Sequence, residues 1–203
     1  DRNNEIIATS IDTNDLYVDT KKSLDKEKLK NVLSDIFRDK ESIFFERIFN
    51  KEQYSLIKKN ISPTELNKLR TVGDPAIKLH ESNKRVYPQH NIFSNLIGLK
   101  TNELISKIEK NMNKKLVEGK NLKLTVDLRI QNIVREELYK SLIEYKAKAA
   151  LAVVMNVKSG EIFSMVSLPD FNPNYPESIL PKTENNLNAE ARYEMGSTLK
   201  IFN

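Results

Sequence analysis

Apolar residues recur at helical spacing through much of the first half of the chain. From Lys26 to Phe37 they fall three and four residues apart, and Asp25 stands where an N-cap would accept the first free amide hydrogens. A second apolar stretch covers residues 43–49. The run Ser-Pro-Thr-Glu that begins at Ser62 is the pattern of a capping box with Pro at the first helical position. The pattern therefore predicts helices that begin directly after Asp25 and Ser62.

Shorter apolar runs between turn-forming residues predict extended structure in the same half. The opening "DRNNEIIATSIDTNDLYVD" favours extended segments joined by a turn at Asn3-Asn4. The stretch "KRVYPQHNIFSNLIGL" predicts a short strand ending at Tyr87 and then a turn of helix up to Gly98. Residues 101–119 are polar and rich in Lys, with one narrow apolar stripe at i, i+4 spacing, and are interpreted as a connector between two domains.

After Gly119 the pattern changes to a strand, a helix and a hairpin. "LKLTVD" at residues 122–127 predicts a strand, and Asp127 can cap the helix that follows. The apolar face predicted for this helix consists of Ile130, Ile133, Val134, Leu138, Leu142 and Tyr145. Two runs rich in β-formers surround residues 158–160, as in a hairpin whose turn uses Gly160 at positive φ. A helix followed by an antiparallel hairpin is typical of the α+β fold class.

Composition narrows the kinds of site that the chain can build. It has no Cys and two isolated His, so disulfides and thiolate or His-rich metal sites are not expected. The net charge is +5, but Lys alternates with Asp and Glu, which favours solvated helix faces over a nucleic-acid site. The longest apolar run, residues 149–157, is too short to span a membrane. Because the chain opens on Asp1 rather than Met, we expect a piece of a longer protein.

Candidate chemistry comes from the pattern Ser-x-x-Lys, which occurs at residues 23–26, 55–58 and 197–200. In a helix this spacing places both side chains on one face, so that the Lys Nζ can reach the Ser Oγ. A Ser hydroxyl needs such a base to act as a nucleophile. A Lys can be that base only when burial or nearby positive charge lowers its pKa.

Context separates the third copy from the other two. Ser23 precedes a predicted helix cap, and Ser55 lies in a predicted polar helix with no Gly beside it, so both are interpreted as structural. At Ser197 the preceding Gly196 leaves space for a substrate carbonyl, and the start of a helix favours negative charge on the Oγ. The competing interpretation is that Ser197 is only a helix N-cap and Lys200 a solvent-facing charge.

Read in order, "TVDLRIQ", "AVVMNVKSGEIFSMVSLPDFNPN" and "YEMGSTLK" resemble the opening third of the penicilloyl-serine transpeptidase domain, which has a β-lactamase-like fold. Upstream, "DRNNEIIA" and "RVYPQH" resemble the pedestal, or dimerisation-type, domain of class B penicillin-binding proteins. Within that class, "YEMGS" and "SLPDFNPN" are most similar to the division-specific, septal enzymes. The resemblance implies a pedestal domain with a helical connector at residues 1–118 and an incomplete transpeptidase domain at residues 119–203, both α+β.

The resemblance also implies an activity for the full-length protein, that of a serine-type D-Ala-D-Ala transpeptidase that cross-links peptidoglycan stem peptides at the septum. Ser197 is then the acylated nucleophile and Lys200 its base, and β-lactam antibiotics acylate the same oxygen. No cofactor or metal is implied. The expected location is the periplasmic face of the bacterial inner membrane, with a membrane anchor upstream of this chain and membrane proteins of the divisome as partners.

Some positions depart from the family pattern. Asn4 and His90 stand where Gly is usual, and the segment between Gly98 and Gly119 is short enough to leave open whether residues are missing there. The family's Ser-x-Asn and Lys-Thr-Gly motifs do not occur downstream of Ser197 in these 203 residues, so the chain by itself is expected to be inactive. Two other interpretations stay open: an elongation-specific class B enzyme, and a non-catalytic divisome interaction module or β-lactam sensor.

Overall fold

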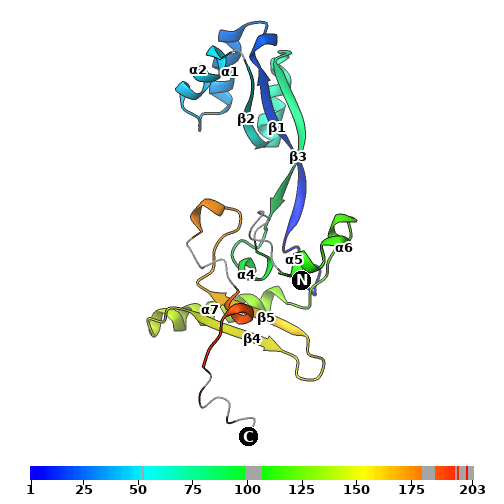
Figure 1. Cartoon of the computed structure of the whole chain (residues 1–203), viewed down its shortest axis with the longest axis vertical. Helices are drawn as coiled ribbons and strands as arrows, with labels where there is room; N and C mark the ends of the chain where they lie inside the picture. The colour runs from blue at the N-terminus through cyan, green and yellow to red at the C-terminus, as the bar shows by residue number, and fades with distance from the viewer. Residues whose placement is uncertain (52, 99–106, 180–185, 195, 197–199, 201–203) are drawn as a thin grey trace. The chain divides into compact units, whose positions relative to one another are not determined.

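The computed structural model describes residues 1–51, 53–98, 107–179, 186–194, 196 and 200 (Figure 1). The chain divides into two compact units: one is Ser10–Arg85, and the other combines Asp1–Thr9 with Val86–Asn203. This division by contacts differs from the domain boundary expected between residues 118 and 119, which stays a prediction. Among the described helices, none has both the length and the apolar character that crossing a bilayer requires.

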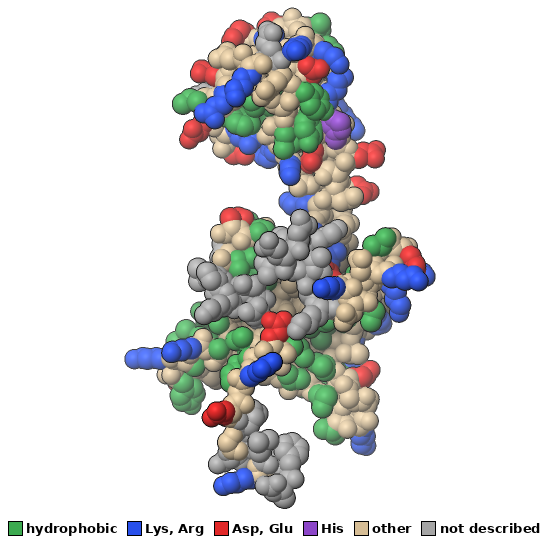
Figure 2. All heavy atoms as spheres, viewed as in Figure 1, with side chains coloured by type: hydrophobic (Ala, Val, Ile, Leu, Met, Phe, Trp, Pro, Cys, Tyr) green, Lys and Arg blue, Asp and Glu red, His purple; other side chains and the backbone are tan. Residues whose placement is uncertain are grey.

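The unit Ser10–Arg85 is built on a three-stranded sheet with the strand order β2-β1-β3. β1 and β2 are antiparallel, and their register is irregular between Asn14 and Tyr17. The elements of this unit are β1 (Thr9–Asp19), the 3₁₀ helix η1 (Thr20–Lys22), α1 (Lys26–Ile36), α2 (Ser42–Asn50), β2 (Tyr54–Ile61), α3 (Pro63–Val72) and β3 (Ile77–Val86). On the face drawn in Figure 2, basic and acidic side chains are interspersed over this unit, as the alternation in the sequence predicts.

One face of this sheet packs against the helices. Leu16 and Val18 of β1 are buried in the same cluster as Leu29 and Leu33 of α1. The remaining members of the cluster are Phe37, Phe45, Ile48, Phe49, Ile57, Ile61, Leu69 and Ala76. The apolar residues at helical spacing in α1 and the alternating apolar residues at the end of β1 therefore pack into one core.

The helix starts predicted for this unit are confirmed. The Asp25 side chain accepts a hydrogen bond from the Lys28 amide at 3.0 Å. Ser62 and Glu65 form a complete capping box, with bonds of 3.2 and 2.7 Å. α3 then ends at Gly73, whose φ of 68° lies in the left-handed region that suits glycine.

The second unit contains a helix packed on an antiparallel hairpin. Its elements are α4 (Ser94–Ile97), α5 (Lys107–Asn111), α6 (Asn113–Val117), α7 (Leu128–Glu144), β4 (Ala150–Met155), β5 (Ile162–Leu168), the 3₁₀ helix η2 (Pro176–Ser178) and α8 (Leu187–Glu190). β4 and β5 pair from Ala150 opposite Leu168 to Met155 opposite Ile162, with a register shift between Val154 and Met155. Gly160 in the connecting turn has a φ of 74°, so the predicted hairpin is confirmed.

A smaller apolar cluster joins distant segments of this unit. Its buried members are Ile7, Tyr87, Phe93, Leu96, Ile97 and Val126, and Met165 of β5 packs against them. Asn4 and His90, where the family resemblance would place Gly, both have positive φ values, of 69° and 51°. Asn tolerates this region better than most residues, and His is among the few others enriched in it.

The strand predicted at residues 122–127 is wrong. This segment makes single bonds rather than a ladder: the Arg2 amide donates to the Val126 carbonyl, and the Asp127 amide donates to the Phe163 carbonyl, each at 2.8 Å. The segment therefore has the composition of a strand but is held by one backbone hydrogen bond to each of Arg2 and Phe163. The predicted connector forms two short helices, α5 and α6, within the described residues 107–119.

Two further predictions need correction. Ile133 and Tyr145, assigned to the apolar face of α7, are 62% and 74% exposed. The buried face of α7 instead contains Gln131, whose polar atoms all find partners.

β3 is ten residues long, far longer than the short strand predicted to end at Tyr87. The sequence does not predict the full length of β3, because residues 80–85 are all polar and show no alternation of apolar and polar positions.

Candidate functional site

Ser197, the predicted nucleophile, lies outside the described residues, so its pairing with Lys200 stays a prediction. Lys200 is described and exposed. Gly196, directly before Ser197, has a φ of 53°, and a Cβ built on it would meet no described atom within 4 Å. The need for glycine at this position is therefore a matter of backbone conformation rather than of a close contact.

In each of the other two copies of Ser-x-x-Lys, one of the two side chains has a structural partner. The Ser23 hydroxyl donates to Asp74 at 3.0 Å. The polar helix predicted around Ser55 is wrong, because Ser55 lies in strand β2. Lys58, its partner in the pattern, donates to Glu65 at 2.9 Å and stands over the ring of Phe37. Neither copy has the arrangement of a nucleophile beside a free base.

The short helix α8 is attached to β5, and it ends seven residues before Ser197. The Asn188 side chain donates to the carbonyl of Val166 at 2.7 Å, and the Leu187 amide donates to the Ser167 hydroxyl at 3.3 Å. α8 also lies against both strands of the hairpin. The hairpin thus holds α8 in place.

Gln131 of α7 is a buried residue that reasoning from the sequence missed. It is 1% exposed, and its side-chain amide contacts the backbone of β5 and of the turn before α4. The signal in the sequence is its spacing, because Gln131 stands three residues before Val134 and seven before Leu138 on the predicted apolar face. A polar residue on such a face indicates a specific set of partners.

The loop after β5 is held by polar side chains as well. Arg135 of α7 donates twice to the Asp170 carboxylate, at 2.5 Å from Nε and 3.1 Å from Nη2, and Asn91 donates to the same group at 3.3 Å. The Asn174 amide pairs with both backbone groups of Tyr87, accepting at 3.1 Å and donating at 2.9 Å. The loop 169–178 is thereby tied to the chain at residues 87–91.

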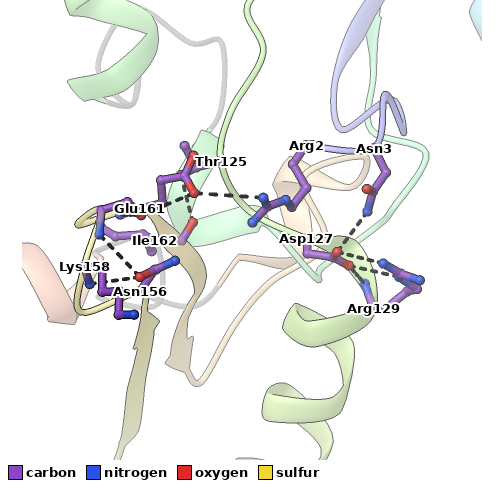
Figure 3. Close-up of polar contacts among 10 residues, drawn as sticks. Arg2, Asn3, Thr125, Asp127, Arg129, Asn156, Lys158, Glu161 and Ile162 are labelled. Atoms are coloured by element: carbon purple, nitrogen blue, oxygen red, sulfur yellow. Dashed lines mark hydrogen bonds and ion pairs between the residues drawn. The ribbon is translucent and has the colours of Figure 1, made fainter.

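Two carboxylates accept hydrogen bonds from the first turn of α7, and Figure 3 shows one of them, that of Asp127. Asp127 accepts from the Arg129 amide at 3.0 Å, as its predicted capping role requires, and from the Arg129 guanidinium and the Asn3 side chain. Asp1 accepts from the Leu128 amide at 3.0 Å. The hydrogen bonds from Arg129, and then the one from Asn3, hold the pKa of Asp127 well below its usual range.

A pH-dependent contribution to stability follows for Asp127. Because its folded pKa is depressed, the contribution is complete above the ordinary Asp pKa of about 3.9 and is lost as the pH falls below it. We expect Asp127→Asn to lower the Tm of the full-length protein by a constant amount from about pH 5 to 7, with the gap to wild type narrowing below about pH 4. Asp35→Asn, at an exposed position of α1, is the control. A gap that persists unchanged below pH 4 would contradict the assignment.

Among the described residues, no three His, Asp or Glu side chains gather as a metal site would need.

Comparison with known proteins relates both halves of the chain to one kind of enzyme. Residues 1–123 match the family model described as the penicillin-binding protein dimerisation domain, and residues 150–203 match the penicillin-binding protein transpeptidase domain. The chain is similar to a probable peptidoglycan D,D-transpeptidase FtsI of Caulobacter vibrioides, 26% identical over 100% of this chain and 36% of the relative.

Two other relatives extend this picture. A peptidoglycan D,D-transpeptidase FtsI of Buchnera aphidicola is 26% identical over 96% of this chain and 40% of its own length. Stage V sporulation protein D of Bacillus subtilis is 43% identical, over 42% of this chain and 13% of its own length. The chain thus spans well under half the length of these curated relatives.

Proposed function

Because the chain belongs to the penicillin-binding proteins, we propose that the full-length protein is a serine-type D-Ala-D-Ala transpeptidase that cross-links peptidoglycan stem peptides. The observation that carries the proposal is the place of "YEMGSTLK": this segment lies within the matched transpeptidase region and follows α8, which is bound to the hairpin. Ser197 is the proposed nucleophile and Lys200 the proposed base.

The proposed reaction has two acyl-transfer steps. The Ser197 Oγ attacks the carbonyl carbon between the two D-Ala residues of a donor stem peptide, and its proton passes to the neutral amine of Lys200. Backbone N–H groups, that of Ser197 among them, stabilise the oxyanion of the tetrahedral intermediate. The intermediate collapses, and the terminal D-Ala leaves with the proton returned from Lys200. An amine of a second stem peptide then attacks the acyl-enzyme and regenerates the Ser197 hydroxyl.

The base role sets a condition on Lys200. A Lys side chain accepts a proton only in its neutral form. Lys200 is exposed among the described residues. The proposal therefore requires that the working site covers Lys200, because burial is what disfavours its charged form. A β-lactam, whose ring carbonyl is attacked in the same way, would acylate the same oxygen.

The boundary of the two domains belongs to the same proposal. We take residues 1–118 as the pedestal domain with its helical connector and residues 119–203 as the first part of the transpeptidase domain. The matches at residues 1–123 and 150–203 support this assignment. The proposed location is the periplasmic face of the bacterial inner membrane, where the substrate is built, with membrane proteins of the divisome as partners.

The activity is tested with purified full-length protein and a peptidoglycan precursor that carries a D-Ala-D-Ala pentapeptide. We expect release of D-Ala together with cross-linked dimers, and inhibition of both by penicillin. A preparation that binds precursor but neither releases D-Ala nor forms dimers would favour a non-catalytic interaction module or a β-lactam sensor.

We propose a septal role, since two of the relatives are named FtsI and the motifs "YEMGS" and "SLPDFNPN" resemble those of division-specific enzymes. The alternative is an elongation-specific enzyme. Depletion of the protein in its own organism separates the two roles, because cells that cannot build a septum grow into filaments, whereas cells that cannot elongate become round. Filaments are the expected result.

A further inference from the structure

Gln131 is the polar group buried most completely within α7. Its side-chain oxygen accepts from the Met165 amide at 2.9 Å and from the Ser164 hydroxyl at 2.8 Å. Its side-chain nitrogen donates to the carbonyls of Met165 and Ile92, both at 3.0 Å. A primary amide has two donors and two lone pairs, so every hydrogen-bonding position of Gln131 is used.

The contact with Met165 has the form of strand pairing. In an antiparallel ladder one residue exchanges both N–H and C=O bonds with its partner, and the Gln131 amide makes this exchange with Met165. On its other side β5 pairs with β4, where Met165 stands opposite Val153. α7 therefore holds β5 at one defined residue, through a side chain that continues the hydrogen bonding of the sheet.

The residues of β5 directly after Met165 hold the next part of the chain. The Val166 carbonyl accepts from Asn188, and the Ser167 hydroxyl accepts from the Leu187 amide. The Asn186 side chain lies 3.3 Å from the sulfur of Met165 itself. A shift of β5 at Met165 is therefore passed on to α8 through groups on three consecutive residues.

We propose that Gln131 is a positioning residue, which fixes β5 and, through β5, the placement of α8, seven residues before Ser197. This inference rests on the proposed function, because it assigns Gln131 an effect on acylation. Gln131 is buried, so the proposed role needs no contact with the substrate. Its contribution is geometric, and displacement of a reacting group by about 1 Å can cost about 10²-fold in rate.

Gln131→Glu in the full-length protein is the most direct test. The substitution keeps the shape but replaces the donating nitrogen with an oxygen that faces the carbonyls of Met165 and Ile92. The two carbonyl oxygens repel a carboxylate at this position, whereas the protonated carboxyl can donate to one of them. This repulsion and the burial of the site together raise the pKa of the introduced carboxyl. Three charged groups belong to the elements around Gln131, and all three already have ionic partners: Asp127 and Arg135 lie four residues to either side on α7, and Asp170 lies on the loop after β5.

We expect Gln131→Glu to lower the rate constant of acylation by a fluorescent penicillin about tenfold at pH 7.5. The non-covalent dissociation constant should change little, since the variant misplaces the nucleophile rather than the binding surface. The ratio of variant to wild-type rate should rise as the pH falls, because protonation restores a donor. Asn132→Asp makes the same exchange of amide for carboxylate on the less buried side of α7 and should acylate at the wild-type rate.

A second variant tests the other end of the chain of contacts. Asn188→Leu keeps the size of the side chain and removes the donor to the Val166 carbonyl, so it should also slow acylation about tenfold, with no dependence on pH relative to wild type. If Gln131→Glu does not fold, the result for Asn188→Leu decides.

The outcomes separate this inference from the proposed function. Wild-type protein that is not labelled by penicillin overturns the proposed function, and the inference with it. Wild-type protein that is labelled, together with variants whose rates stay within about twofold of wild type at every pH, overturns the positioning role alone. Slow labelling by both variants, with recovery of Gln131→Glu at acid pH, supports it.

Discussion

Replacement of Ser197 by Ala is expected to abolish covalent labelling of the full-length protein by penicillin while the fold is retained. The variant loses one hydroxyl oxygen, which is the atom that forms the ester with the antibiotic. If Ser197 begins a helix, loss of its capping bond costs about 0.5 to 2 kcal/mol of stability, which is too little to unfold a protein of typical stability.

Fluorescent penicillin on a denaturing gel measures the labelling, and circular dichroism of the same sample reports the fold. The chain supplies a matched control in Ser23→Ala, which removes the hydroxyl of another Ser-x-x-Lys copy. That hydroxyl donates to Asp74, so this variant should be labelled like wild type. Labelling of the Ser197→Ala protein would show that the nucleophile is a different residue.

Lys200→Arg is expected to slow acylation nearly as much as Lys200→Ala does. Arg keeps the positive charge but stays protonated in proteins, so it cannot take the proton from Ser197. General-base catalysis contributes about 10² to 10⁴-fold to such a step, and both variants should lose an effect of that size.

The measurement is the second-order rate constant of acylation, followed by stopped-flow or quenched-flow labelling. Lys58→Arg is the control, because Lys58 stands in an ion pair with Glu65 that an Arg can replace, and its rate should equal that of wild type. A near-wild-type rate for Lys200→Arg would mean that Lys200 supplies charge rather than proton transfer.

Features that depend on a few neighbouring residues could be predicted from the sequence. Asp25, Ser62 and Asp127 were recognised as helix caps because the donor that each side chain meets lies two or three residues along the chain. The turn of the β4–β5 hairpin is equally local, since Gly160 alone supplies the positive φ that it needs. The family resemblance, carried by short motifs in order, depends on the same local information.

Features that depend on distant partners were missed or mistaken. The segment 122–127 has the composition of a strand, but whether it joins a ladder is decided by Arg2 and Phe163, far away in the sequence. Gln131 was passed over because its partners, Met165 and Ile92, lie 34 and 39 residues away. Tertiary contacts of this kind override the local pattern.

Mass spectrometry of the full-length protein after incubation with a β-lactam tests the central claim most directly. We expect one adduct per molecule, with the mass of the opened lactam, on the proteolytic peptide that contains Ser197. An adduct on any other residue, or no adduct on folded protein, would contradict it.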